Sequence, residues 1–388
     1  MFSPNDQAAN DAFKDFLPQA GRAYATRRNY DFGPDQRDNV SMLSPWIHLR
    51  MLPEWVVLKA VLESHSQSEA GKFIDEVCWH TYSKGWLQQH PEVWDNYLAA
   101  IENLRPEFAD HLGYNKAIQG QTGIDCFDAW SQELVQQGYL HNHARMWFAS
   151  IWVHTLKLPW ELGAAFFLEH LYDGDAAANT LGWRWVSGLH TRGKAYLARR
   201  DNIKKYTDGR CDPSTPLAEE PIDFGDDYAN PAKTAIPELK ELPKDGRIGL
   251  LLHESDLSAP DWIADQCAID AHCALFPESR CKAMGICTRV IDFRKEAIRA
   301  SLSDRDPLFS QTSEVVAWAQ DQKLDWVVLA EPPIGYVRPL VPKLKSQLEA
   351  VDIGLRFARH WWDEHFFPKA GAGFFKLKKA IPKALEQL

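Results

Sequence analysis

The chain has 388 residues, 45% of them hydrophobic and 25% charged, a composition that supports a folded core and about two domains. Its net charge of −10 excludes a protein that is basic throughout, although a local basic groove could still bind nucleic acid. Seven cysteines without framework spacing favour the reducing cytoplasm. We expect no signal peptide and no membrane segment, because no apolar stretch is long enough.

Residues 1–206 carry apolar side chains at helical spacing and show no convincing run of alternating strand residues. Helices are predicted at 54–64, 70–88, 126–137, 143–157 and 161–172. Proline near the starts and glycine near the ends of these segments supports the assignment. We therefore predict a mostly α-helical domain over residues 1–206.

Residues 207–246 are rich in proline and acidic residues and poor in large apolar ones, which predicts a linker that packs partly along the surface. After it, short apolar runs alternate with helical stretches. This pattern predicts an α/β, Rossmann-like domain with a parallel sheet over residues 247–388. Strands are predicted at 247–252, 288–293, 326–329 and 354–358, and helices at 313–322 and 341–351.

The segment 138–185 gathers residues suited to a large, partly polar ligand. Asn142, Arg145 and Met146 share one face of a predicted helix. Asp173-Gly174-Asp175 then places two carboxylates at a turn, and Asn179, Trp183 and Trp185 follow. Taken singly, each has a structural explanation: Arg145 with Asp173 could be a structural ion pair, and the tryptophans could belong to the core.

Together, these residues resemble the flavin-binding core of the DNA photolyases and cryptochromes. The runs His-Asn-x-x-Arg-Met, Asp-Gly-Asp-x-Ala-x-Asn and Gly-Trp-x-Trp occur in that family's order and spacing. The resemblance implies noncovalent FAD. Within this segment the FAD-binding residues it implies are Asn142, Arg145, Asp173, Gly174, Asp175 and Asn179.

Upstream, Val40-Ser41-Met42-Leu43-Ser44-Pro45 resembles the family's phosphate-binding Thr-Ser-Arg-Leu-Ser-Pro. Hydroxyl and backbone N–H groups at a helix entry can hold a pyrophosphate, although the two serines alone would be an ordinary helix cap. Met42 replaces the usual arginine, which removes one expected phosphate contact. Tyr24 resembles the tyrosine that touches the FAD phosphates, and Phe73 completes the predicted FAD site.

Glu76-Val77-Cys78-Trp79 resembles the family's Glu-x-x-Trp substrate element. Residues i and i+3 share a helix face, so the carboxylate lies beside the indole. The resemblance implies that Trp79 stacks on a base flipped out of DNA and that Glu76 hydrogen-bonds its carbonyls. Stacking contributes about 1–3 kcal/mol per base, comparable to the cost of flipping. The alternative is a half-buried tryptophan capped by an acid.

The resemblance also implies the lesion. Asn142 and Met146 match the cyclobutane-dimer enzymes, because relatives that repair (6-4) photoproducts commonly carry histidines at these positions. With Glu76, Trp79 and Trp185 they form the predicted substrate site. His80 replaces the family's common arginine, which weakens the expected grip on DNA.

Sixteen tryptophans are unusual for this length, and some could pass electrons rather than only fill the core. Trp183 and Trp160 match the proximal and next members of the family's electron-transfer chain. The third position, near Glu107, has no tryptophan, so Tyr114, Trp147 or Trp152 could substitute, or the chain could stop early. The predicted catalytic residues are Glu76, Asn179, Trp160 and Trp183.

Photolyases begin with an α/β antenna domain, whereas here the helical part comes first. Residues 371–376 resemble the tail of that antenna domain, so we predict an exchanged domain order. Gly371-x-Gly373 lacks the context of a dinucleotide fingerprint. The spacing of Cys267, Cys273, Cys281 and Cys287 is unlike that of common metal sites, so no metal is predicted. Nothing in the sequence indicates which antenna chromophore is used.

The function predicted from this resemblance is light-driven splitting of cyclobutane pyrimidine dimers in single- or double-stranded DNA, by electron transfer from reduced FAD. The first alternative is a cryptochrome-like blue-light photoreceptor that signals without repair, and the second is a flavin-binding protein without a light function. The acidic charge and His80 favour the alternatives. Glu76, Trp79, Met146 and Trp185 favour repair. The sequence does not indicate the oligomeric state.

Overall fold

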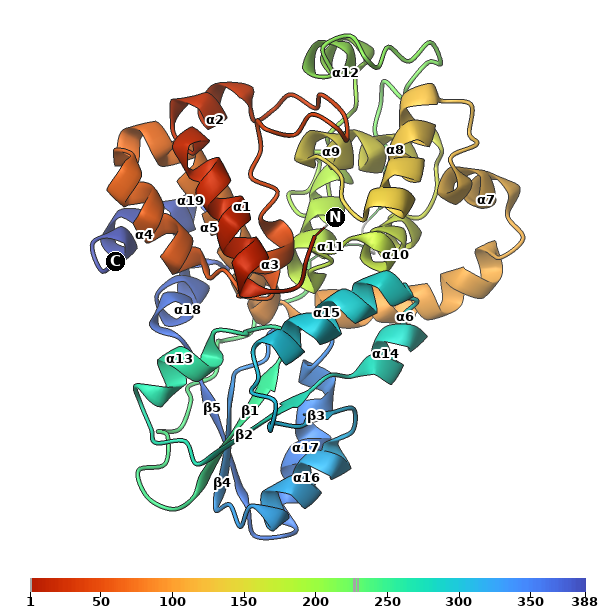
Figure 1. Cartoon of the computed structure of the whole chain (residues 1–388). Helices are drawn as coiled ribbons and strands as arrows, with labels where there is room; N and C mark the ends of the chain where they lie inside the picture. Colours follow the sequence, from red (N-terminus) through yellow and green to blue (C-terminus); the bar gives the residue numbers. More distant parts are fainter. Residues whose placement is uncertain (1, 226–227, 229) are drawn as a thin grey trace.

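A computed structural model describes residues 2–225, 228 and 230–388, so Asp226, Asp227 and Ala229 of the predicted linker lie outside the described residues. The first part of the chain is helical, which confirms the predicted fold class (Figure 1). Its elements are α1 (Asp6–Phe16), η1 (Leu17–Gln19), α2 (Arg22–Arg27), α3 (Ser44–His48), α4 (Glu54–Ser64), α5 (Gln67–Gln89), α6 (Pro91–Phe108), α7 (Leu112–Gln119), α8 (Asp125–Gln137), α9 (Asn142–Ser150), the π-helical turn η2 (Ile151–Thr155), α10 (Trp160–His170), α11 (Ala176–Val186) and α12 (Arg200–Tyr206).

Helix α5 is the longest element, and both parts of the molecule pack against it. A capping box starts it: the Ser66 side chain accepts from the Glu69 N–H, and the Glu69 carboxylate accepts from the Ser66 N–H. Its last turns, from Thr81 to Gln89, are buried on every side because α11 covers one face and helices from the end of the chain cover another. This position makes α5 the natural place for a site shared by both parts.

The second part is a parallel sheet flanked by helices. Its elements are β1 (Ile248–His253), α13 (Ala259–Ala264), β2 (Ala271–Leu275), α14 (Glu278–Ala283), α15 (Thr288–Ala300), β3 (Leu308–Phe309), α16 (Thr312–Asp321), β4 (Trp326–Ala330), η3 (Arg338–Leu340), α17 (Val341–Glu349), β5 (Gly354–Ala358), α18 (Trp361–Phe366), η4 (Phe367–Lys369), α19 (Phe374–Lys378) and α20 (Ile381–Leu385). The strand order is β3-β2-β1-β4-β5, and every pairing is parallel.

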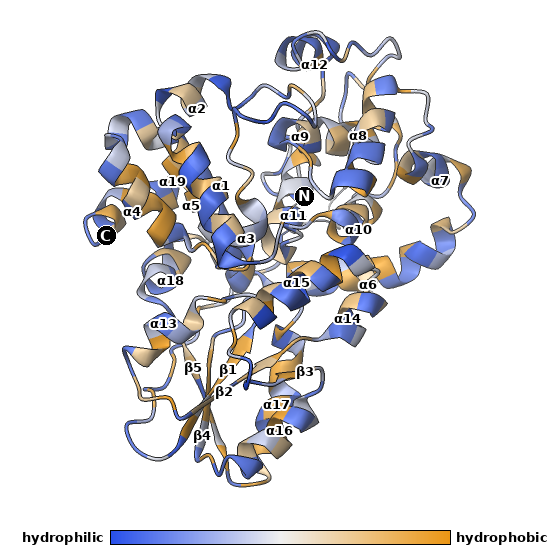
Figure 2. Ribbon diagram, in the orientation of Figure 1, coloured by the Kyte–Doolittle hydropathy of each residue, from blue (hydrophilic) through white to orange (hydrophobic). Residues whose placement is uncertain are grey.

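Strand β1 lies at the centre of this sheet between β2 and β4, and Figure 2 shows β1 and β4 as largely hydrophobic. All six residues of β1 are buried, as expected for a strand covered on both faces. Three predicted strands are present: those at 247–252, 326–329 and 354–358 correspond to β1, β4 and β5. Strand β2 was not predicted, because polar His272 interrupts its apolar run.

The predicted strand at 288–293 is wrong, since these residues form the first half of α15. The apolar pair Val290 and Ile291 mimics a buried strand in a six-residue window. Over the whole segment, Ala297 and Ile298 repeat that buried pair seven residues later, which is the spacing of a helix face.

A buried ion cluster around Arg50 joins the two parts. The Arg50 Nε lies 3.2 Å from Glu54, and Nη1 lies 2.9 Å from Asp256, in the loop after β1. Its Nη1 and Nη2 also donate to the two oxygens of Asp363 on α18, at 2.8 and 2.6 Å. Beside this cluster, the Trp362 indole donates to Thr81 of α5 at 2.9 Å. These contacts hold the end of the chain against the helical part.

Arg50 and Lys84 reach into the crevice at the carboxyl ends of the strands. Doubly wound sheets usually bind ligands there, but a cavity of only about 20 Å³ is left.

Among the described residues, no helix has both the length and the apolar content that crossing a bilayer requires.

Replacing Arg50 with methionine should lower the free energy of unfolding by about 3–5 kcal/mol, because the carboxylates it serves would stay buried without their partner. Urea denaturation at neutral pH measures this loss. As a control, Arg200→Met removes an exposed ion pair with Asp212 and should change stability little. A similar small change in both variants would contradict the assigned role of Arg50.

Candidate functional site

The predicted flavin turn Asp173-Gly174-Asp175 joins α10 to α11 and is buried. Arg145 on α9 donates to both oxygens of Asp173, at 3.0 and 2.8 Å, so the two motifs that sequence reasoning paired do meet. Burial alone would raise the pKa of Asp173, but Arg145 and the Ser44 hydroxyl hold that pKa below its ordinary value. Asp173 is therefore ionised at neutral pH.

The α/β part supports this turn from the other side. The Arg294 side chain on α15 is fully buried and donates to the Gly174 carbonyl at 2.9 Å. The Tyr336 hydroxyl donates to the same oxygen at 3.3 Å. Sequence reasoning missed both residues, because nothing in their spacing connects them to a turn more than a hundred positions earlier.

The predicted phosphate-binding run lies at the entry of α3. Met42 has a φ of 51°, a left-handed conformation that is uncommon for a non-glycine residue. Ser41 and Val40 are partly exposed, and Leu43 is buried. Because the Ser44 side chain is close enough to Asp173 to lower the pKa of that carboxyl, this run adjoins the flavin turn.

The remaining predicted FAD residues lie on α2, α5, α9 and α11. Tyr24 on α2 meets Phe73 on α5 edge to face, with ring centroids 5.2 Å apart. The Asn179 amide donates to the Ala164 carbonyl at 2.9 Å. Asn142 starts α9 and is exposed, one turn before the half-buried Met146.

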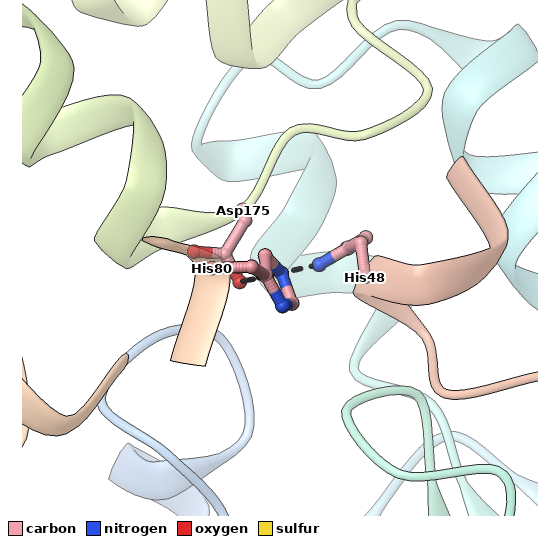
Figure 3. A group of neighbouring side chains, drawn as sticks. All are labelled: His48, His80 and Asp175. Carbon is pink, nitrogen blue, oxygen red and sulfur yellow. Dashed lines mark hydrogen bonds and ion pairs between the residues drawn. The ribbon is translucent and has the colours of Figure 1, made fainter. Parts of the chain in front are cut away.

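A cluster that sequence reasoning missed lies beside the turn (Figure 3). The His48 Nδ1 is 3.3 Å and the His80 Nε2 is 3.9 Å from the same oxygen of Asp175. The Glu54 carboxylate accepts from the other His80 nitrogen at 3.0 Å. The Nε2 atoms of both histidines are buried and have no hydrogen-bond partner among the described residues, as expected beside a bound polar group.

The three side chains of this cluster also have the chemistry of a metal site. One ligand atom from each of His48, His80 and Asp175 lies within 4.8 Å of the others, and two imidazoles with a carboxylate suit zinc or iron. Burial lowers the pKa of His48 to about 4, so that ring is neutral. However, the positive Lys84 Nζ lies 3.4 Å from the His48 carbonyl and opposes a cation. We assign this cluster to the flavin turn.

Two tryptophans stand out by their exposure. Trp79 on α5 and Trp185 on α11 are each 39% exposed, the largest values among all the tryptophans, and both are predicted substrate residues. Glu76 lies one turn before Trp79, with the Arg28 Nε 3.5 Å away. Burial raises the pKa of Glu76, which favours the protonated form that can donate to a base carbonyl.

The predicted electron-transfer tryptophans are buried. Trp183 packs edge to face on Phe167 and on Trp152, with centroids 5.0 and 6.1 Å apart. A Cβ on Gly163 would lie 2.2 Å from the Trp183 ring, so only glycine permits this packing of α10 on α11. Trp160 packs on Tyr97 instead, at 5.9 Å.

Of the three substitutes suggested for the missing third tryptophan, Trp152 touches Trp183 directly. Its other edge meets the partly exposed Tyr114, with centroids 5.9 Å apart. Trp147 stacks on Trp130 at 5.5 Å. The geometry therefore offers a second route outward from Trp183 through Trp152 to Tyr114.

Comparison with known families bears on residues 73–246. A family described as the FAD binding domain of DNA photolyase matches residues 73–246. This match, together with the photolyase relatives, supports membership of the photolyase/cryptochrome superfamily. Its cofactor is FAD, and the flavin turn, the Arg145 pair and most of the predicted FAD residues fall within the matched range.

Several curated members of this superfamily resemble the chain. A deoxyribodipyrimidine photo-lyase from Streptomyces griseus is 30% identical over 48% of this chain and 45% of its own length. A deoxyribodipyrimidine photo-lyase from Thermus thermophilus is 31% identical over 50% of this chain and 45% of its own length. A solved class III photolyase from Agrobacterium tumefaciens is 24% identical, with a TM-score of 0.45, over 53% of this chain and 43% of its own. The chain thus spans about half the length of the curated relatives it matches.

Replacing Arg145 with alanine should weaken FAD retention on the order of 10-fold or more, because Asp173 would remain buried without its partner. The ratio of flavin to protein absorbance after gel filtration measures retention. Arg200→Ala, which removes an arginine with an exposed partner, should keep the wild-type ratio. Full retention of FAD by Arg145→Ala would show that the ion pair does not support the flavin.

Proposed function

We propose that this protein splits cyclobutane pyrimidine dimers in damaged DNA under blue light. The observation that carries the proposal is the exposure of Trp79 and Trp185 in a protein whose other tryptophans are more buried, together with Glu76 one turn from Trp79. The curated relatives named deoxyribodipyrimidine photo-lyase support the reaction class. In the same proposal, residues 1–206 and 247–388 are separate domains in exchanged order, joined by 207–246.

The chain's own residues bind and orient the lesion in this mechanism. Trp79 stacks on a flipped base, and Trp185, which itself packs on Tyr196 at 5.5 Å, provides a second aromatic surface. Glu76 hydrogen-bonds the polar edge of the base, as its resemblance to the family's Glu-x-x-Trp element implies. Asn142 and Met146 line the same side by resemblance to the cyclobutane-dimer enzymes. Reduced FAD, held at the flavin turn beside Arg145 and Asp173, would supply the electron for opening the cyclobutane ring and would recover it afterwards.

A photoreceptor function is the second candidate, and one observation favours it. Arg294 and Tyr336 both donate to the Gly174 carbonyl, so a change at the flavin turn has a direct hydrogen-bonded route into the α/β part. In that case light would alter the contact between the two parts without repair of DNA.

Glu76→Ala and Trp79→Ala should each lower dimer binding and repair by about 10-fold or more while leaving the flavin spectrum intact, because both residues serve the substrate. Repair of a dimer-containing oligonucleotide under blue light is the measurement. Glu76→Gln and Trp79→Phe keep a donor and a stacking ring, respectively, and should retain more activity. Wild-type repair by both alanine variants would refute the substrate assignment.

Trp183→Phe should abolish rapid photoreduction of FAD by an external reductant, because Trp183 is the proposed proximal donor. Trp160→Phe should slow it if the family's route is used, and Trp152→Phe should slow it if electrons arrive from Tyr114. Flavin absorbance under illumination reports each rate. Trp147→Phe serves as the control and should leave the rate unchanged. Repair with chemically pre-reduced flavin should survive all four changes, and a wild-type rate in Trp183→Phe would exclude the proposed donor.

A further inference from the structure

The last helices of the chain form a basic segment in an acidic protein. Residues 365–385 contain no aspartate or glutamate, although the whole chain has a net charge of −10. We call residues 365–385 the basic tail. Its lysines are Lys369, Lys376, Lys378, Lys379 and Lys383. Such a concentration of one charge is the usual electrostatic signature of a surface that binds polyanions.

The basic tail is held beside the proposed lesion-binding residue. Phe374 of α19 stacks face to face on Trp79, with ring centroids 4.0 Å apart and planes 9° apart. The Tyr82 hydroxyl donates to the Ala372 carbonyl at 2.8 Å. Lys378 pairs with Asp75 on α5, so this acid is already neutralised by one lysine of the tail. Trp79 thus has one face covered by the tail and remains 39% exposed elsewhere.

The outer side of the basic tail is open to solvent. Lys376, Lys379 and Lys383 are exposed, and none of them forms an ion pair with an acid in the part of the chain that the structure describes. Phe375, next to the buried Phe374, is 80% exposed, the highest value among the large hydrophobic side chains in the described ranges. An aromatic ring among unpaired lysines combines the two features of surfaces that bind nucleic-acid strands: phosphate attraction and base stacking.

We propose that the basic tail is the element that grips the DNA backbone next to the lesion. Lys376, Lys379 and Lys383 contact phosphates flanking the flipped nucleotide, and Phe375 packs on an adjacent base. This inference rests on the proposed function in DNA repair and assigns part of the DNA contact to the α/β part. It also explains how the chain holds DNA although His80 stands where the family commonly has arginine.

The test compares two triple variants of the full-length, FAD-loaded protein. Lys376→Gln/Lys379→Gln/Lys383→Gln removes the exposed charges of the tail. The matched control, Lys323→Gln/Lys343→Gln/Lys345→Gln, removes three exposed charges at and near α16 and α17, on the side of the sheet away from the helical part in Figure 1. Fluorescence anisotropy follows the binding of single- and double-stranded oligonucleotides, with and without a dimer, between about 50 and 200 mM salt.

For the tail variant we expect the slope of log K against log salt to become less negative by about 2 to 3, because each lost phosphate contact removes nearly one unit. Its flavin spectrum should be unchanged, and the control variant should keep the wild-type slope. Phe375→Ala should weaken binding several-fold without altering the slope, since stacking does not depend on salt as phosphate contacts do.

The outcomes separate this inference from the proposed function. A wild type that repairs dimers, with an unchanged slope in the tail variant or an equal loss in the control, would overturn the role of the tail and leave repair standing. A tail-dependent slope in a protein that never repairs a dimer would support the tail and overturn repair. A wild type without salt-dependent DNA binding would overturn both.

Discussion

The burial of Arg50 among Glu54, Asp256 and Asp363 is the interaction on which the arrangement of the molecule depends. Removing an ion from water costs several kcal/mol unless it is paired, so these groups are stable only when both parts of the chain are in place. Other contacts cross the same boundary: α19 packs on α5, and Arg294 of α15 hydrogen-bonds the flavin turn.

The contact of α15 with the flavin turn and the contact of α19 with α5 concern different stages of the proposed chemistry, namely cofactor binding and substrate binding. Arg294 donates to the Gly174 carbonyl while Arg145 pairs with Asp173, so both parts of the chain contact the flavin turn. Phe374 covers one face of the Trp79 ring. The α/β part therefore contacts both the flavin turn and the proposed substrate residue Trp79.

The helices and the residues that belong to recognisable motifs could be predicted from the sequence. The helices of the first part follow from apolar spacing, and the pairing of Arg145 with Asp173 follows from runs that occur together at family spacing. The strand predicted at 288–293 failed because its short window hid a helical repeat. The cluster of His48, His80 and Asp175 and the stack of Phe374 on Trp79 join residues far apart in the chain. Contacts of this kind arise from tertiary packing, which leaves no local pattern to read.

The support of the Gly174 carbonyl by Arg294 and Tyr336 has a consequence for synthesis on the ribosome. The helical part is translated before α15 and Tyr336, so these two hydrogen bonds form only after more than a hundred further residues have been added. A nascent chain that has completed only α12 would hold the turn through contacts of the helical part alone, such as that of Arg145 with Asp173. Folding around the flavin turn is therefore completed only once the α/β part has been synthesised.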